Sequence, residues 1–165
     1  MENSTELIHQ TFVKYGWTLS LAESCTGGAI AARLTKKAGC SAYFLGSIVA
    51  YSNTLKIKIL RVNDDLLQKF GAVSREVVKE MGVNVKELTG SHYSIAVSGI
   101  AGPGGGTPNK PVGLIWAAIC GPDLAEPYVW SFQLTGNREQ IIEEAVNNVL
   151  NQLWMLIKTK VKCMP

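Results

Sequence analysis

A serine stands where an apolar, alternating run ends and a helical pattern begins. Ser24 follows residues 17–21, which alternate with the period of a half-buried strand, and precedes Cys25, Thr26 and two glycines. A serine on such a turn can expose its hydroxyl as a nucleophile, and the amides of Cys25 and Thr26 can hold the oxyanion of an acyl-transfer reaction. Two other interpretations stay open: Ser24 and Thr26 can be helix caps, and Cys25 can be the nucleophile.

A serine nucleophile needs a base, and the two histidines are poorly placed to supply it. His9 falls in the first expected helix, and His92 begins an expected strand. A lysine can act instead when burial or a neighbouring cation lowers its pKa. Lys56 is the candidate base, with Tyr51 as a proton relay, although a solvated lysine and a core tyrosine are the commoner roles of such residues.

Residues 99–111 form a stretch rich in glycine and proline that is long for a connection within a compact domain. Backbone amides in such a loop can approach a phosphate or a planar ring closely, and the stretch begins at Ser98. It is neither a Walker A sequence nor a dinucleotide-binding glycine motif, and a flexible connection is an equally good interpretation. Arg138, at the start of the last expected helix, can clamp a phosphate.

The elements that must position these residues alternate between helix and strand. Helices are expected over residues 5–15, 26–37, 55–60, 63–70, 74–88 and 137–156, and strands over residues 17–21, 44–50, 93–98, 112–120 and 128–134. This order predicts an α/β fold: a single three-layer α/β/α domain with a mixed, mainly parallel sheet and an antiparallel hairpin near the C-terminus.

Length and composition predict one domain over residues 1–165. The chain is 47% hydrophobic and 18% charged, which suffices for one core. Its net charge of +3 is scattered, which argues against nucleic-acid binding and suits a small anionic ligand. Four cysteines and two histidines are widely spaced, so no metal site is expected. Neither a signal peptide nor a run of ~18 apolar residues is recognised, so we expect a cytoplasmic protein with no membrane partner.

Four separated segments together resemble the CinA C-terminal domain family, as a stand-alone domain. They are Ala22 to Gly28, Tyr51-Ser52-Asn53 with Lys56, Gly71 to Ser74, and Ser98 to Pro103 followed by Lys110 to Gly113. Residues Gly136-Asn137-Arg138 are similar to the family's final glycine-x-arginine element. Any one segment would be a weak signal, whereas the combination covers nearly the whole chain.

The resemblance implies a nicotinamide-nucleotide amidohydrolase. Such an enzyme converts the carboxamide of nicotinamide mononucleotide to nicotinate mononucleotide and ammonia in pyridine nucleotide (NAD) recycling, without a cofactor. Ser24 is then the nucleophile, assisted by Lys56 and Tyr51. The residues expected to bind the substrate are Cys25, Thr26, Gly27, Gly28, Asn53, Ser98, Gly99, Ala101, Gly102 and Arg138.

Two further expectations accompany the resemblance. Some family members have Asp where this chain has Gly104, and a carboxylate there would order the ribose and affect affinity more than chemistry. Exposed apolar residues in the strand at 44–50 or in the last helix are expected to support a homo-oligomer. A catalytically silent nucleotide-binding or sensing module of the same fold is the alternative function.

Overall fold

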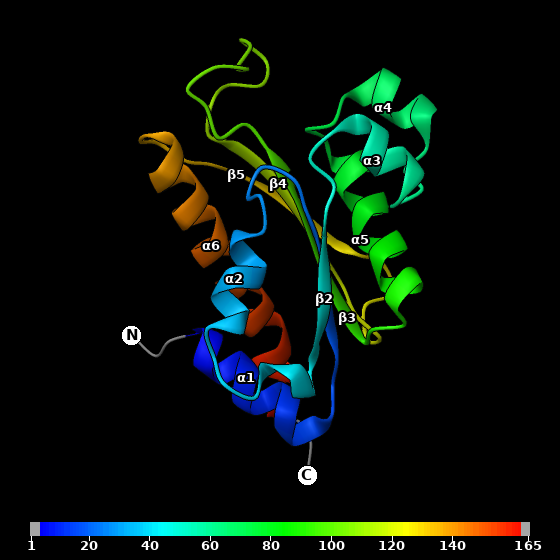
Figure 1. Ribbon diagram of the computed structural model, residues 1–165, viewed down its shortest axis with the longest axis vertical. Helices are drawn as coiled ribbons and strands as arrows, with labels where there is room; N and C mark the ends of the chain where they lie inside the picture. Colours follow the sequence, from blue (N-terminus) through cyan, green and yellow to red (C-terminus); the bar gives the residue numbers. More distant parts are fainter. Residues whose placement is uncertain (1–3, 163–165) are drawn as a thin grey trace.

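A computed structural model describes residues 4–162 of the chain, built on a five-stranded sheet (Figure 1). The strands lie in the order β2-β1-β3-β4-β5. Their bounds are β1 Leu19–Glu23, β2 Phe44–Val49, β3 Tyr93–Gly99, β4 Leu114–Cys120 and β5 Tyr128–Gln133. The helices are α1 Ser4–Tyr15, α2 Ala29–Thr35, α3 Asn53–Lys58, α4 Asp64–Phe70, α5 Arg75–Thr89 and α6 Arg138–Val161, with a short 3₁₀ helix, η1, at Cys40–Ala42.

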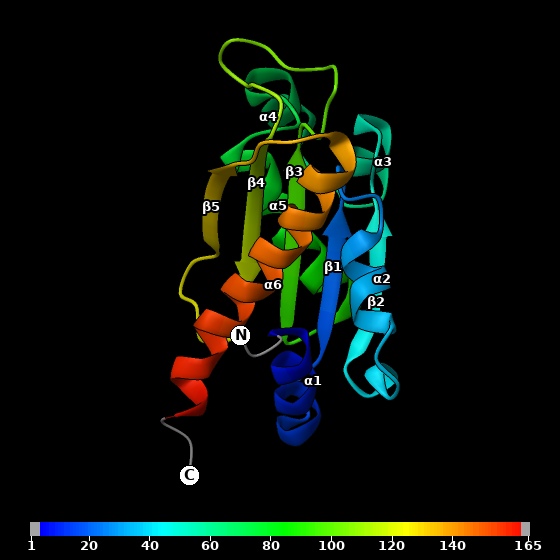
Figure 2. The same ribbon diagram turned by 90° about the vertical axis from the view of Figure 1, so that its left-hand side faces the viewer.

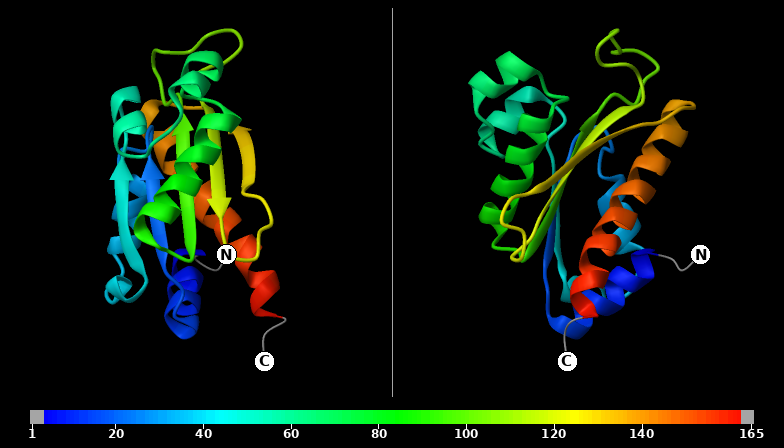
Figure 3. Two further views of the ribbon diagram at one scale, coloured as in Figure 1. Left: turned by 90° about the vertical axis from the view of Figure 1, so that its right-hand side faces the viewer. Right: turned by 180° about the vertical axis from the view of Figure 1, so that it is seen from behind.

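Helices cover both faces of the sheet. Helices α1, α2 and α6 lie on one face, and α5 lies on the other with α3 and α4 beside it (Figures 2 and 3). Each face has its own apolar core, one holding Phe12, Leu21 and Leu153 and the other holding Val78 and Met81. The three-layer α/β/α prediction is therefore confirmed.

The sheet is mixed, as the sequence predicts. Strand β1 pairs in parallel with both β2 and β3, whereas β4 is antiparallel to β3 and to β5. The helices after β1 and β2 provide the crossovers that parallel pairing needs, and the short turn between β4 and β5 makes the expected hairpin. In this register Glu23 lies opposite Val49 and Val97, so β1, β2 and β3 end at one edge of the sheet.

The first strand begins and ends two residues later than predicted. The amide of Trp17 donates to the carbonyl of Phe12, and the Trp17 ring packs against Phe12 and Tyr93. Trp17 thus belongs to an aromatic cluster at the end of α1 rather than to β1. The strand continues to Glu23, which makes Ser24 the first residue beyond it.

Two helix starts also differ from the sequence prediction by more than one residue. Helix α2 begins at Ala29 instead of residue 26, because Gly27 and Gly28 have φ values of 58° and 98°, in the left-handed region. Helix α3 begins at Asn53, two residues early, because the Ser52 hydroxyl accepts from the amide of Leu55 and caps it. Along residues 4–162 no helix combines the length and apolar character that a membrane crossing requires.

Candidate active site

Strand pairing brings Ser24 and Lys56 together although 32 residues separate them. The Ser24 amide donates to the Val97 carbonyl at 3.0 Å, and the Ala50 amide donates to the Glu23 carbonyl at 2.9 Å. These bonds hold the ends of β1, β2 and β3 side by side. From the first turns of α3, Lys56 then reaches back to place its Nζ 3.0 Å from Ser24 Oγ.

Lys56 is a buried lysine without a carboxylate partner. Its side chain is 1% exposed, and Nζ also donates to the carbonyl oxygens of Ala50 at 2.7 Å and Tyr51 at 3.3 Å. None of the ion pairs formed within residues 4–162 includes Lys56. Burial lowers the pKa of Lys56 from its ordinary value of 10.5, since the charged ammonium loses its solvation. A neutral amine facing a serine hydroxyl is the arrangement that a general base requires.

The turn that carries Ser24 has two backbone donors that no other residue uses. Among the described residues, the amides of Cys25 and Thr26 donate no hydrogen bond to another residue, and the Cys25 amide faces only the sulfur of its own side chain. The amides of Gly28, Ile30 and Ala31, at the start of α2, all donate to the Glu23 carboxylate instead. Two N–H groups beside the nucleophile thus remain available for an oxyanion.

The structure does not support the interpretation of Ser24 and Thr26 as helix caps. The N-cap position of α2 is Gly28, which has no side chain to offer, and the Thr26 hydroxyl donates to Glu23 at 2.7 Å. Glu23, the residue whose carboxylate serves α2 as its cap, was not among the predicted site residues. The signal for it was a single acidic residue at the end of a strand, directly before Ser24.

A cavity of about 260 Å³ opens over Ser24 and Lys56. Ten predicted site residues line it: Ser24, Cys25, Tyr51, Asn53, Lys56, Ser98, Gly99, Ala101, Gly102 and Arg138. Thr26, Gly27 and Gly28 are not part of its lining. The wall is completed by Gly104, where the sequence analysis expects an effect on affinity, and by four residues that are not among the predicted site residues: Ala72, Val73, Ile100 and Gly105. Three of these, Ala72, Val73 and Ile100, belong to segments on which the family resemblance rests, so a signal for them was present.

Arg138 closes one side of the cavity. It is the first residue of α6, and its guanidinium donates to the carbonyl of Gly102 and to the hydroxyl of Tyr51, both at 2.7 Å. The Tyr51 side chain is 56% exposed, and its contact with Lys56 is made by the backbone carbonyl rather than by the hydroxyl. The first turn of α6, α3 and the glycine loop meet at the same end of the sheet (Figure 1).

Polar contacts join the two ends of the glycine loop. The amide of Ile100 donates to the carbonyl of Leu114 at 3.0 Å, and the amide of Gly113 donates to the carbonyl of Ile100 at 2.7 Å. At the end of β3, the Ser98 hydroxyl donates to the carbonyl of Ala72 at 2.8 Å. The loop therefore forms a built wall of the cavity over residues 99–105, rather than only a connection.

Cys25 lines the cavity but is poorly suited to be the nucleophile. Burial raises the pKa of its thiol from 9.0 to about 12, so the thiolate is scarce at neutral pH. Across the described part of the chain, His, Cys, Asp and Glu side chains form no group of three or more that could hold a metal ion.

With this geometry in place, comparison with known proteins gives the family. The profile of the CinA C-terminal domain matches residues 1–157. The chain belongs to the CinA C-terminal domain family.

Relatives in the family are similar over most of this chain. A CinA-like protein of Prochlorococcus marinus (strain MIT 9515) is 40% identical over 162 residues, which are 98% of this chain and 37% of the relative. A CinA-like protein of Thermosipho melanesiensis is 49% identical over 140 residues, covering 84% of this chain and 34% of the relative. The chain thus spans about a third of the length of these curated relatives.

Solved structures of CinA proteins share the fold. A competence-damaged protein (CinA) superfamily protein from Escherichia coli aligns with a TM-score of 0.88 at 32% identity, over 94% of this chain and 89% of its own. The competence/damage inducible protein CihA from Agrobacterium tumefaciens aligns with a TM-score of 0.89 at 36% identity, over 93% of each chain. These matches agree with the observed three-layer CinA fold.

Proposed function

We propose that this CinA-family chain hydrolyses the carboxamide of nicotinamide mononucleotide to nicotinate mononucleotide and ammonia, in pyridine nucleotide recycling. The observation that carries the chemistry is the buried, carboxylate-free Lys56 with its Nζ 3.0 Å from Ser24 Oγ. The family resemblance supplies the choice of substrate, and the cavity over the pair supplies a place for it.

The first half of the reaction is transfer of the acyl group to serine. Neutral Lys56 takes the proton of the Ser24 hydroxyl as Oγ attacks the carboxamide carbon. The free amides of Cys25 and Thr26 hold the oxyanion. Protonated Lys56 then gives that proton to the amide nitrogen and returns to its neutral form. The carbon–nitrogen bond breaks and ammonia leaves.

The second half is hydrolysis of the ester on Ser24. Lys56 takes a proton from water while the water oxygen attacks the acyl carbon, and the same two amides hold the second oxyanion. The proton returns to Ser24 Oγ as the ester bond breaks, which releases the carboxylic acid. No step uses a cofactor or a metal.

The phosphate of the nucleotide is assigned to the mouth of the cavity. The start of α2 cannot take it, because Glu23 already occupies those amides with a carboxylate. Arg138 has N–H groups left after its two hydrogen bonds, and the neighbouring glycine loop adds backbone amides. Asn53, whose side chain has an amide that can both donate and accept, is suited to orient the carboxamide.

An ammonia-release assay with matched variants tests the proposal. Wild-type protein should release ammonia from nicotinamide mononucleotide without added metal, and Ser24→Ala should lower kcat by about 1,000-fold or more. Cys25→Ala, the neighbouring control, should keep most of the activity because its thiol stays protonated.

Two results would contradict the proposal. Full turnover by Ser24→Ala together with loss of activity in Cys25→Ala would make cysteine the nucleophile. Binding of nicotinamide mononucleotide in a calorimeter, with no ammonia released by the wild type, would leave a silent nucleotide-binding module.

A further inference from the structure

Glu23 is a fully buried carboxylate whose partners surround the serine turn. Its Oε2 accepts from the Thr26 hydroxyl at 2.7 Å and from the amides of Gly28 at 3.1 Å and Ile30 at 3.0 Å. Its Oε1 accepts from the amide of Ala31 at 3.0 Å and from the hydroxyl of Ser47 at 3.0 Å. Five donors thus meet one carboxylate, and four of them come from the turn and from the helix that follows it.

These bonds tie the two ends of the turn together. The main chain of Glu23 is fixed in the sheet by pairing with β2 and β3, while its side chain holds Thr26 and the first turn of α2. Ser24 and Cys25 lie between these two anchors. The turn has two glycines in left-handed conformations, and the amides of Gly27 and Ala29 donate to the carbonyls of Ser24 and Thr26, both at 3.0 Å. The carboxylate adds side-chain bonds to this backbone turn.

The carboxylate also accepts from the backbone amides at the start of α2 and from none beside Ser24. By accepting from Gly28, Ile30 and Ala31, it uses the donors at the start of α2 and leaves those of Cys25 and Thr26 beside Ser24. A glutamine of the same shape cannot accept all of these bonds, because both oxygens of Glu23 accept from N–H or O–H donors. In either orientation the NH₂ group of the glutamine would face a donor; in the place of Oε1, for example, it would face the amide of Ala31.

From this geometry we infer that Glu23 is a positioning residue for the reaction: its carboxylate aims the Ser24 hydroxyl at Lys56 and sets the oxyanion amides. The inference rests on the proposed function for its substrate, but its geometry concerns only the nucleophile. Glu23 acts through the turn and does not line the cavity.

A matched pair of variants separates positioning from stability. Thr26→Val and Ser47→Ala each remove one hydroxyl donor to the same carboxylate, the first on the turn and the second on β2. We expect Thr26→Val to lower kcat about 10-fold and Glu23→Gln about 100-fold, with KM nearly unchanged, since small misplacements of reacting groups are costly. Ser47→Ala should keep kcat, and Thr26→Ser, which retains the hydroxyl, should restore it.

A second readout does not depend on the substrate. A fluorophosphonate labels an activated serine, and the rate at which Ser24 is labelled, followed by mass spectrometry of the intact protein, should fall in Thr26→Val and Glu23→Gln and stay unchanged in Ser47→Ala. Thermal unfolding of all four variants shows that each one is folded. If Glu23→Gln does not fold, Thr26→Val carries the test.

The possible outcomes distinguish failure of the proposed function from failure of the inference about Glu23. A wild type that is labelled but releases no ammonia from nicotinamide mononucleotide refutes the proposed function, while the labelling rates still test the inference. Equal kcat and equal labelling in wild type and Thr26→Val overturn the inference alone, as does an equal loss in Thr26→Val and Ser47→Ala. A wild type that is neither active nor labelled overturns both.

Discussion

Lys56 is the residue on which the chemistry depends, and its burial predicts a pH dependence. Because burial lowers its pKa below 10.5, the neutral amine is present at lower pH than for an exposed lysine. We expect kcat/KM to rise with pH through the lowered pKa of Lys56 and then to level off. The pH–rate profile of wild type and Lys56→Ala checks this. An unchanged rising limb in Lys56→Ala would exclude Lys56 as the base.

The same pKa shift predicts a pH dependence of stability. Between the lowered pKa and 10.5, the unfolded chain holds a proton on Lys56 and the folded chain does not. The free energy of unfolding therefore gains a contribution as pH rises through this window and loses it as pH falls. The free energy of unfolding of the wild type, minus that of Lys56→Met, should therefore rise with pH over that range. Urea unfolding at several pH values measures it, and a difference independent of pH would contradict the shift.

Gly104 is a position where one residue should change affinity rather than chemistry. It lines the cavity, and a Cβ added there would meet no atom within 4 Å. We expect Gly104→Asp to lower KM for nicotinamide mononucleotide a few-fold, since a carboxylate can accept hydrogen bonds from ribose hydroxyls, and to leave kcat within about two-fold. Gly104→Asn, which lacks the charge, is the control. Steady-state kinetics measures KM and kcat of both variants. An unchanged KM in Gly104→Asp would show that the ribose does not bind beside residue 104.

At the scale of elements, the glycine loop depends on how closely its end approaches β5. Gly113 has φ +91°, and a Cβ there would lie 1.9 Å from the carbonyl oxygen of Leu134. We expect Gly113→Ala to lower the free energy of unfolding by about 3 kcal/mol or more, because conformational strain and a backbone clash add together. Gly16→Ala is the matched control: Gly16 has φ +64° but no atom within 4 Å of the added Cβ, so only about 1 kcal/mol is expected. Equal losses in urea unfolding would contradict this.

The elements were easier to predict from the sequence than their contacts. Hydrophobic periodicity places β1, cap-forming residues place α3, and glycine and proline mark the loop between β3 and β4, because period and turn chemistry are local properties. The contact between Lys56 and Ser24 is not local, since it depends on the register in which β1 pairs with β2. The resemblance to the family named both residues, and the parallel register explains why they meet.

Glu23 shows what the local pattern could not reveal. Its position next to Ser24 was visible, but its role depends on the late start of α2, which was predicted three residues too early. Because α2 begins at Ala29, Thr26 lies in the turn, where its hydroxyl donates to Glu23. The amides of Ile30 and Ala31 lie in the first turn of the helix and donate to the same carboxylate. An error in one boundary therefore concealed the residue that holds the turn.

At the scale of the whole molecule, the two apolar cores explain why the fold class was predictable. The long helices α5 and α6 each present an apolar face of period 3.6 to a sheet whose central strands are buried on both sides. The assembly of the molecule follows less directly. Strand β2 is an edge of the sheet and exposes Leu45 and Val49, but the homo-oligomer stays a prediction, which sedimentation velocity can measure.

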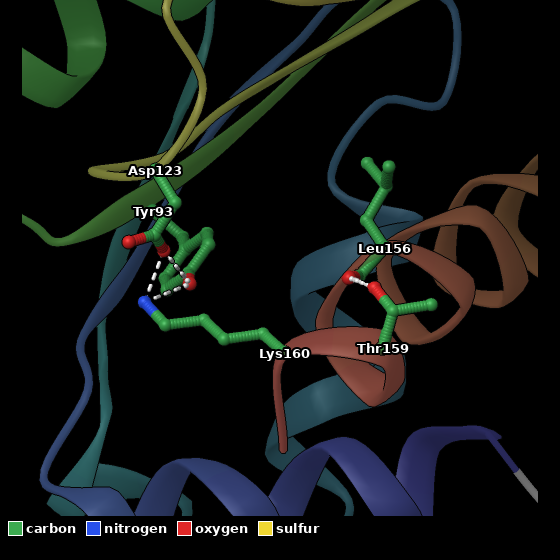
Figure 4. A network of polar contacts seen from close by, with 5 residues as sticks. All are labelled: Tyr93, Asp123, Leu156, Thr159 and Lys160. Carbon is green, nitrogen blue, oxygen red and sulfur yellow. Dashed lines mark hydrogen bonds and ion pairs between the residues drawn. The ribbon is translucent and has the colours of Figure 1, made fainter. Parts of the chain in front are cut away.

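The end of the sheet opposite the cavity has a polar network of its own. Lys160, near the end of α6, pairs with Asp123, and the Tyr93 hydroxyl donates to the same carboxylate at 3.3 Å (Figure 4). The Lys160 ammonium also lies 4.7 Å from the centre of the Trp17 ring. These contacts fasten the last turns of α6 to the start of β3 and to the turn before β5.

Distance along β3 separates this network from the chemistry. Tyr93 begins β3 and Gly99 ends it at the cavity, a separation of roughly 20 Å at the rise of a strand. We expect Lys160→Met to lower the free energy of unfolding by about 1 kcal/mol at low salt, and by less at high salt, because partly exposed ion pairs are screened. The rate of ammonia release should not change, since no group near Ser24 moves. Urea unfolding at two ionic strengths and the ammonia assay measure both effects, and a loss of kcat without a loss of stability would show that the two ends of the sheet are coupled.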